Sequence, residues 1–299
     1  MAVQITTVNV NGIRAAVKER NAANPGMLAW LKDSGSDVVL LQEVRATLEQ
    51  TQAALAPALE AGWHYVGAPA AAKGRAGVGI LSRRPLDDVQ IGFGSFEDAG
   101  RWIEGTVDGI RVASLYLPSG SAGTPKQDEK YHFLDEFTEL LRERAREFPD
   151  MVIGGDWNIC HRKEDLKNWS GNRTKSGFLP DERRFMDSVF GSFPDEASQV
   201  EAGVGEYAGA VDYRSDVARA VAEAPEWFDV QRRLSPEGPG PYTWWTYRGQ
   251  AFNNDAGWRI DYQAATRSML DRAESFHIGK APTVEQRWSD HAPLSIRYR

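Results

Sequence analysis

Short runs of strand length recur along the whole chain and constrain its fold most. Apolar or β-branched runs bounded by turn residues are typical of β-strands. Two stretches are helical instead: apolar residues recur at helical spacing over Gln127–Glu147, and Asp181–Phe190 opens with acids at the positive end of a helix. The expected strands are Val3–Asn9, Asp37–Gln42, Val78–Ser82, Arg111–Leu117, Met151–Gly154, Tyr242–Tyr247, Arg259–Thr266, Arg272–Ile278 and Leu294–Arg297.

The order of these elements predicts the fold class. Strands outnumber helices and do not alternate with them one for one, as they would in a doubly wound sheet. We therefore expect an α/β protein with two sheets packed face to face and helices outside, a four-layered α/β sandwich. The length of 299 residues suits one domain, 1–299, with a surface insertion at about 195–240, where the sequence is irregular.

Composition excludes several classes of protein. Hydrophobic residues make up 41% and charged residues 26%, which is typical of a globular chain and not of a disordered one. The sequence has no apolar run of the roughly 18 residues that a membrane span needs, and its start lacks the layout of a signal peptide. We expect a cytoplasmic protein without a membrane partner. Cys160 is the only cysteine, which excludes an internal disulfide and a cysteine-based zinc site.

The formal net charge of −7 at first argues against nucleic acid as a partner. The charge is unevenly distributed, however. Residues 162–184 carry a local net charge of +3, and residues 201–230 carry −5. The acidity is therefore concentrated in one segment and says little about the remaining surface.

Polar residues follow apolar runs in at least five separated places. For one such residue, a turn or a helix cap is the usual explanation. Taken together, they favour a site at one rim of the sandwich. These residues are Asn9 and Asn11 after the first run, Glu43 after the second, Asp156 and Asn158 after MVIGG, Asp261 within WRIDY, and Asp290 with His291 before the last run.

Side-chain oxygens dominate this set, and they point to a hard divalent cation. Carboxylate and amide oxygens are the ligands that Mg²⁺ or Mn²⁺ prefers, whereas zinc fits less well because histidines are few and scattered. Mg²⁺ held by a few carboxylates commonly works on phosphate substrates. Hydrolysis of a phosphodiester is the reaction class that follows.

His291 needs a partner from another strand. Neighbours in an extended segment point to opposite sides, so Asp290 is badly placed to bond the imidazole beside it. Asp261 is the candidate partner. A carboxylate paired to His291 would raise the pKa of the imidazole and let it donate to a phosphate oxygen.

Eight ordered segments resemble exonuclease III and the related AP endonucleases, within the endonuclease/exonuclease/phosphatase superfamily that includes deoxyribonuclease I. The resemblance covers nearly the whole chain except about 195–240. GFLPDER and GWRIDY are specific to the exonuclease III branch. The segments are VNVNGIRA at 8–15, LQEVR at 41–45, GVGILSR at 77–83, LYLPSG at 115–120, GDWNI at 155–159, GFLPDER at 177–183, GWRIDY at 257–262 and SDHAP at 289–293.

The resemblance implies a deoxyribonuclease I-like fold and a role for each matching residue. Glu43 resembles the principal metal ligand, with Asn9 and Asp290 beside the ion. Asp156 resembles the residue that orients or deprotonates the attacking water, and Asn158 the amide that supports it; both also stand among the expected metal ligands. His291, held by Asp261, resembles the histidine at the scissile phosphate. Tyr116 resembles a tyrosine near that phosphate, although a rim tyrosine packed for structure is the alternative.

Substrate contacts are also implied by the resemblance. Trp244, Trp258 and Ile260 match the walls of a small apolar pocket for a deoxyribose without its base, with a core role for the tryptophans as the alternative. Asn168 and Asn172 match positions that contact backbone phosphates. The loop after the matching tyrosine has no arginine here, so we expect Lys126 to supply charge to the duplex in its place.

The resemblance implies a Mg²⁺-dependent DNA repair nuclease that cleaves 5′ to abasic sites and removes nucleotides or blocking groups from 3′ ends of duplex DNA. We expect it to act as a monomer without an obligate protein partner. Two alternatives stay open. One is a phosphodiesterase of the same fold acting on RNA, a phosphoinositide or a phospholipid head group, and the other is a DNA-binding protein that has lost catalysis.

Overall fold

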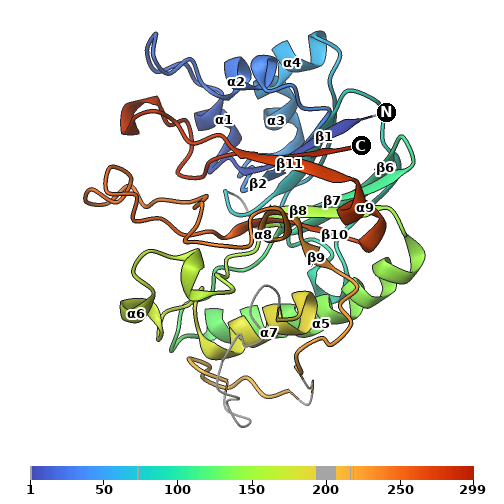
Figure 1. Cartoon of the computed structure of the whole chain (residues 1–299). Helices are drawn as coiled ribbons and strands as arrows, with labels where there is room; N and C mark the ends of the chain where they lie inside the picture. Colours follow the sequence, from blue (N-terminus) through green and yellow to red (C-terminus); the bar gives the residue numbers. More distant parts are fainter. Residues whose placement is uncertain (1, 73, 193–206, 216, 218) are drawn as a thin grey trace.

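The computed structural model describes residues 2–72, 74–192, 207–215, 217 and 219–299 and contains two six-stranded sheets (Figure 1). The first sheet has the strand order β11-β12-β1-β2-β4-β3, and the second β5-β6-β7-β8-β10-β9. The strands are β1 Val3–Asn9, β2 Val38–Gln42, β3 His64–Ala68, β4 Val78–Ser82, β5 Asp87–Ile91, β6 Trp102–Val107, β7 Ile110–Tyr116, β8 Met151–Asp156, β9 Phe228–Asp229, β10 Asp261–Ala265, β11 Ala273–Ile278 and β12 Leu294–Tyr298.

Both sheets are mixed. β1 pairs with β2, and β7 with β8, in parallel; the other pairings are antiparallel. β1 lies between β2 and β12, so the first and last strands of the chain share one sheet. Residues from both ends of the sequence can therefore meet at the ends of neighbouring strands.

Helices cover the outer face of each sheet. α1 to α4 lie over the first sheet, and α5 and α7 over the second (Figure 1). In the part of the chain that is described, none of the helices combines the length and apolar composition that crossing a bilayer requires. The helices are α1 Ile13–Ala16, α2 Met27–Asp33, α3 Leu48–Ala54, α4 Ala56–Glu60, α5 Pro125–Glu147, α6 Trp169–Asn172, α7 Pro180–Phe190, α8 Val230–Leu234 and α9 Arg267–Arg272.

Three apolar layers hold these four layers of backbone together. Successive residues of a strand point to opposite faces, and β2 uses both faces. Val38 and Leu40 pack into the core between the sheets, whereas Val39 and Leu41 pack under the helices of the first sheet. The third layer lies between the second sheet and α5 and α7, and it includes Phe137. The predicted four-layered α/β sandwich is confirmed.

Gly154 lets the two sheets approach each other closely at β8. A Cβ atom at this position would lie 2.5 Å from Leu40 Cδ1 and 3.0 Å from Thr7 Cβ on the opposite sheet. A larger residue would therefore push the sheets apart. The close approach brings the end of β8 near the end of β1, where Asp156 and Asn9 lie.

The main difference from the predicted elements is in the region 242–247. We expected a strand there, but Trp244 makes only isolated bridges to Trp258 and His291. The segment pairs with two loops at the rim instead of entering a sheet, so the strand prediction is wrong. β3, β5, β6 and β9 were not predicted.

The region 195–240, expected to be an insertion, is described only in part, because residues 193–206 lie outside the described residues. In the described part, β9 joins the second sheet, and Tyr213 and Trp227 pack into the core of that sheet. The structure therefore places this described part within the sandwich.

Candidate active site

Strand register brings the expected catalytic residues to one rim of the sandwich. Tyr116, Asp156 and Asp261 lie opposite one another on the adjacent strands β7, β8 and β10. Asn9 ends β1 opposite Gln42, so that Glu43 follows directly at the same edge. His291 reaches this edge from the segment before β12. Residues that are far apart in the sequence thus meet because their strands end at one edge.

Asp156, Asp261 and His291 form a compact buried group. His291 Nδ1 lies 2.9 Å from Asp261 Oδ2, and His291 Nε2 lies 3.8 Å from Asp156 Oδ2. The first distance is a hydrogen bond, whereas the second is too long for one. The structure therefore pairs His291 with Asp261, as the sequence predicted, and leaves Nε2 free to face a substrate near Asp156.

Burial and mutual charge set the protonation of this group. Burial by itself would lower the pKa of His291, but the carboxylates of Asp261 and Asp156 outweigh it and raise that pKa to about 10. Burial raises the pKa of Asp156 to about 7, with the neighbouring charges of Asp261 and Glu43 adding to the rise and His291 opposing it. At neutral pH His291 is therefore a cation that can donate from Nε2, next to a carboxyl group suited to exchange a proton.

Amide side chains connect the expected metal ligands into one hydrogen-bonded set. Asn9 Nδ2 donates to Glu43 Oε1 at 2.8 Å and to Asp156 Oδ2 at 2.9 Å. Asn11 donates from Nδ2 to Asp290 Oδ1 at 2.9 Å and from its backbone to Asn9 Oδ1. The carboxylate of Glu43 is thereby connected with four other acidic or amide side chains at the same edge.

Asn158 joins this set from the loop after β8. Its backbone N–H donates to Asp156 Oδ1 at 3.0 Å, and its Nδ2 donates to the carbonyl of Leu117 at 2.8 Å. All five expected ligands, Asn9, Glu43, Asp156, Asn158 and Asp290, therefore belong to one connected cluster.

This donor set fits a hard divalent cation. Asn9 bridges the carboxylates of Glu43 and Asp156, and Asn11 links Asp290 to Asn9, so three carboxylates belong to one hydrogen-bonded set in which a cation would offset their like charge. Asp261 Oδ1 is also buried and has no hydrogen-bond partner. Asp156 and Asp261 have carboxylate oxygens within 4.8 Å of each other and of His291, which is protonated and therefore acts as a donor and not as a metal ligand. The chemistry of the oxygens favours Mg²⁺ or Mn²⁺ over softer metals.

The backbone is strained at three of these positions. Asn11, Glu43 and Asn158 have φ values of 48°, 49° and 51°, in the left-handed region that most side chains avoid. Asparagine tolerates this region better than other residues, but glutamate does not. Such strain clusters at functional sites, where the surrounding structure holds a side chain in one direction.

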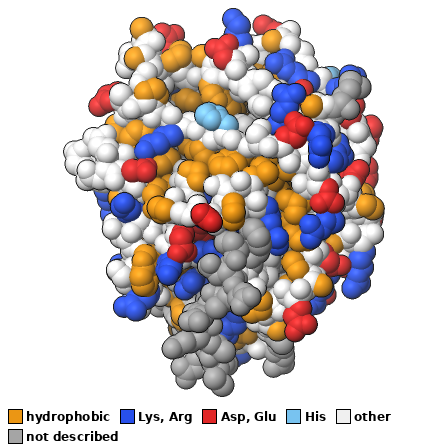
Figure 2. Space-filling model, in the orientation of Figure 1, with side chains coloured by type: hydrophobic (Ala, Val, Ile, Leu, Met, Phe, Trp, Pro, Cys, Tyr) orange, Lys and Arg blue, Asp and Glu red, His pale blue; other side chains and the backbone are white. Residues whose placement is uncertain are grey.

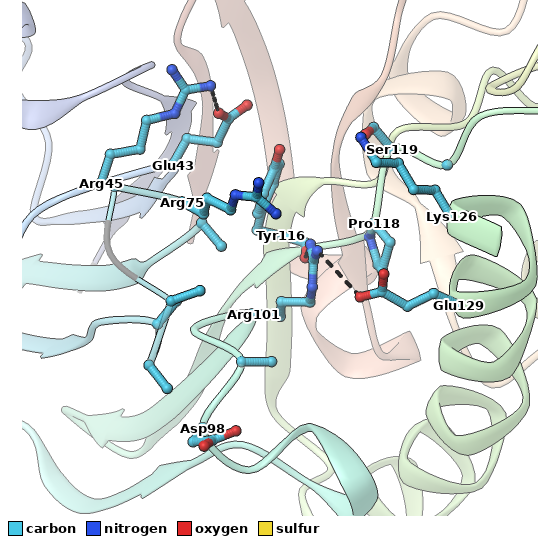
Figure 3. A pocket seen from close by; sticks show the side chains of 17 residues that line it. Glu43, Arg45, Arg75, Asp98, Arg101, Tyr116, Pro118, Ser119, Lys126 and Glu129 are labelled. Carbon is cyan, nitrogen blue, oxygen red and sulfur yellow. Dashed lines mark hydrogen bonds and ion pairs between the residues drawn. The ribbon is translucent and has the colours of Figure 1, made fainter. Parts of the chain in front are cut away.

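Tyr116 and Glu43 form one wall of a cavity of about 550 Å³ beside the catalytic group (Figure 3). Burial, followed by the carboxylates of Glu43 and Asp156, raises the pKa of Tyr116 well above its usual range. Tyr116 is therefore a neutral phenol that can donate a hydrogen bond. Four cations line the cavity, together with Asp98 and Glu129: Arg45, Arg75, Arg101 and Lys126.

Arg101 is a partly desolvated cation in this cavity. Its side chain is only 17% exposed, and its contacts are weak: 3.3 Å to the carbonyl of Tyr116 and 3.8 Å to Glu129. Burial lowers the pKa of Arg101. Tyr116, Glu129 and Glu43 raise that pKa and offset part of the effect. A buried guanidinium with long contacts is suited to receive an anionic group of a ligand.

Trp244, Trp258 and Ile260 meet in one apolar cluster on the other side of Asp156. The two indole rings are 6.0 Å apart and perpendicular. Trp244 also donates from Nε1 to Asp290 Oδ2 at 3.0 Å, which ties the cluster to the acidic set. Trp245 points the opposite way and packs against Phe252, so only one of the two neighbouring tryptophans faces this recess.

Asn168 and Asn172 lie at the ends of the short helix α6, next to this recess. Leu166 forms a bridge with Trp258, which anchors the segment that leads into α6. Asn168 is exposed, and Asn172 Nδ2 donates to the carbonyl of Asn168 at 2.8 Å. Positive and negative side chains are interspersed over the face in Figure 2.

Three cations next to the site were not predicted: Arg45, Arg75 and Arg101. Arg45 forms an ion pair with Glu43, and Arg101 lines the cavity beside Tyr116. Arg45 lies within a segment that carries the resemblance, only two positions after Glu43, which was a usable signal. Arg101 follows a glycine in an irregular stretch, and no pattern in the sequence marks it.

Comparisons with known proteins agree with the fold. Residues 6–291 match the model of the Endonuclease/Exonuclease/phosphatase family. An exodeoxyribonuclease of Bacillus subtilis (strain 168) is 27% identical over 291 residues, which is 96% of each chain. The DNA repair nuclease APEX1 of Danio rerio is 26% identical, over 98% of this chain and 81% of its own.

A solved structure is similar throughout its length. The 3′-5′ exonuclease NExo of Neisseria meningitidis superposes with a TM-score of 0.78 at 26% identity, covering 99% of both chains. The sandwich is thus of the deoxyribonuclease I-like type expected from the sequence. The chain belongs to the endonuclease/exonuclease/phosphatase family, on the branch of exonuclease III and the AP endonucleases, and is a phosphodiester hydrolase.

Proposed function

We propose that this protein is a Mg²⁺-dependent DNA repair nuclease that cleaves duplex DNA 5′ to abasic sites and trims 3′ ends. One observation carries the proposal: the buried Asp156, Asp261 and His291 group lies between a connected set of oxygen ligands and an apolar recess walled by tryptophan. The relatives named above are an exodeoxyribonuclease and a DNA repair nuclease, which supports DNA as the substrate.

The chemistry follows from the protonation of the three central residues. Asp156 orients an attacking water and accepts its proton, and the pKa of about 7 suits a base that works at neutral pH. His291, with its pKa of about 10, is protonated and donates from Nε2 to a phosphate oxygen. Asp261 fixes the ring by accepting from Nδ1. Charge that develops on the phosphate is thereby met by a buried donor that is already fixed in place.

Glu43, Asp290 and Asn9 would hold the metal ion, with Asp156 and Asn158 next to it. When bound, Mg²⁺ neutralises negative charge on the phosphate oxygens. Asn158 stabilises the same charge from the loop after β8. Tyr116 is a neutral donor beside Glu43 and serves to position the phosphate.

The recess of Trp244, Trp258 and Ile260 supplies selectivity for an abasic sugar. A deoxyribose without a base leaves the helix without losing stacking or base pairing, whereas a normal nucleotide loses both. The perpendicular indoles leave an apolar surface for the sugar ring. A small phospholipid or inositol substrate has no need of this recess together with the Asn168 and Asn172 segment, and a protein that only binds DNA has no need of Asp156 or His291.

Incision of a duplex with a single tetrahydrofuran abasic analogue tests the proposal. We expect cleavage directly 5′ to the analogue in Mg²⁺ and none with EDTA. His291→Ala should cut about 10²-fold more slowly, since it removes a donor to the developing charge. An undamaged duplex and an RNA duplex of the same sequence are the control substrates. Equal cutting with EDTA, or faster cutting of the RNA, would contradict the proposal.

The cationic cavity predicts a measurable share of DNA binding. Arg75 and Lys126 are exposed, form no ion pair among the described residues and line the cavity on the β7 side of Asp156. We expect Arg75→Ala with Lys126→Ala to reduce the slope of log Kd against log salt concentration by about 2, one for each lost phosphate contact. Fluorescence anisotropy with a labelled duplex measures this slope.

The matched control removes two exposed arginines from the opposite end of the sheets, Arg84 and Arg267. This control should leave the slope unchanged. If the cavity variant and the control variant have the same slope as the wild type, the cavity does not contact DNA phosphates.

A further inference from the structure

A buried ion pair joins α5 and α7 beneath the catalytic loop. Lys130 Nζ lies 2.7 Å from Glu182 Oε1, and neither side chain is exposed to solvent. Burying two charges costs several kcal/mol per ion unless further hydrogen bonds satisfy them. The contacts of both residues therefore indicate what the pair holds in place.

Lys130 reaches the loops that carry the site. Its ammonium group donates to the carbonyl of Asn158 at 2.9 Å and to the carbonyl of Ser119 at 3.3 Å. Asn158 has a left-handed backbone, and Ser119 lines the cationic cavity. One buried cation thus fixes the catalytic loop and the loop after Tyr116 at the same time.

Glu182 holds the loop on the other side. Its Oε2 accepts from the backbone N–H of Gly177 at 2.7 Å and of Leu179 at 3.0 Å, and its Oε1 accepts from Ser176 Oγ at 3.1 Å. Gln127 Nε2 donates to the same Oε1 at 3.0 Å. The carboxylate therefore has a full set of donors, most of them from residues 176–179.

Gly177 lies directly between the catalytic loop and the apolar recess. Its φ is +93°, and a Cβ atom there would lie 2.8 Å from the ring of Trp258 and 3.3 Å from the carbonyl oxygen of Asn158. Any shift of the 176–179 loop would therefore move the wall of the recess against Asn158. Gly177 therefore fills the space between Trp258 and the carbonyl of Asn158, and neither group can move toward the other.

Helix packing alone does not account for the pair. α5 and α7 already share apolar contacts, with the rings of Phe137 and Phe185 6.3 Å apart. We propose that Lys130 and Glu182 are positioning residues that set Asn158 relative to Trp258, so that the catalytic amide and the sugar recess keep one spacing. The proposal rests on the proposed function, because it concerns the distance between its catalytic and recognition groups.

Lys130→Met and Glu182→Gln test the proposal, since both keep the side-chain size and remove the charge. Misplacing a catalytic group by about 1 Å costs up to about 10²-fold in rate. We expect kcat on the abasic analogue to fall about 30-fold in each variant, with KM within about threefold of the wild type. The binding segment at α6 is untouched, which is why KM should change little.

Arg111→Met is the matched control. Arg111 and Glu104 form a buried ion pair with Nε to Oε2 at 3.1 Å, near the end of β7 that lies away from Tyr116. Arg111→Met should lower the melting temperature but leave kcat within about twofold, measured at a temperature where the protein is folded. If it loses as much kcat as Lys130→Met, the effect is general destabilisation and the positioning proposal is wrong.

Hydrogen exchange gives a second measurement that does not depend on activity. The amides of Gly177 and Leu179 should exchange faster in Lys130→Met and Glu182→Gln, together with segment 156–160, but not in Arg111→Met. Unchanged exchange with unchanged kcat would overturn the positioning role. A wild type that cuts no abasic DNA would refute the proposed function, and exchange alone would then decide the role of the pair.

Discussion

Asp156→Asn is expected to lower kcat for incision at an abasic analogue by about 10³-fold, because the amide can neither accept the proton of the attacking water nor carry its charge. Asp156 lies between Asn9, Asn158 and His291, with contacts of 2.9 Å, 3.0 Å and 3.8 Å respectively. Single-turnover kinetics at saturating DNA isolate the chemical step from binding and product release.

The affinity for uncleaved duplex should change little in this variant, since Asp156 is buried at the base of the site and is not among the residues proposed to contact backbone phosphates. Asp271→Asn provides an exposed carboxylate control and should keep the wild-type rate. A rate within tenfold of the wild type for Asp156→Asn would remove Asp156 from the role of base.

Asp165→Asn is expected to reduce the free energy of unfolding by about 3–5 kcal/mol, because it removes a buried carboxylate that pairs with two buried arginines. Asp165 binds Arg259 with Nε at 2.8 Å and binds Arg232 with Nη2 at 2.6 Å. Arg259 also reaches Asp229 at 2.7 Å. This network lies behind the recess, since Arg259 separates Trp258 from Ile260. Urea unfolding at pH 7 measures the loss.

The pH dependence of this variant follows from the pKa of Asp165. Burial alone would raise that pKa, but Arg259 and Arg232 outweigh it and hold it well below its usual range. A carboxyl whose folded pKa is depressed stabilises the fold above its unfolded pKa of about 3.9, and this stabilisation is lost as pH falls toward the folded pKa. The difference between wild type and Asp165→Asn should therefore be largest at neutral pH and shrink below about pH 4.

Asp271→Asn is the matched comparison for stability as well. Its ion pair with Arg267 is exposed, with N and O 3.8 Å apart, and such pairs contribute between about 0 and 1 kcal/mol. If Asp165→Asn costs no more than Asp271→Asn at pH 7, the buried network does not stabilise the fold.

The sandwich was predictable because a strand that is covered on both faces must be apolar along its whole length, and the sequence shows such runs. β2 and β8 are apolar on both faces, and a continuous apolar run between turns indicates a strand covered on both sides. β5 is an edge strand with mostly exposed residues, and it carries no such signal. The segment at Trp244 reads as a strand locally, but it pairs with loops, and only the tertiary arrangement decides that.

The candidate site was predictable as a set of residues but not as a geometry. Polar residues at the ends of apolar runs identified Asn9, Glu43 and Asp156, because several such residues together are unusual for turns alone. The need for a remote partner identified Asp261 for His291, and the structure has that hydrogen bond. Lys130 is different: it lies on a helix among polar neighbours, and nothing local distinguishes a buried lysine from a solvated one.

Glu43 and Asn158 have a left-handed backbone, so the residues needed for catalysis differ from the residue that would best stabilise the fold at these positions. A carboxylate and an amide are kept where glycine would relax the main chain, so the acid and the amide persist at some cost to the native state. Selection for stability and selection for catalytic rate therefore favour different residues at these two positions. A relative that no longer needed catalysis is expected to lose Glu43 and Asn158 first, and to become more stable and inactive.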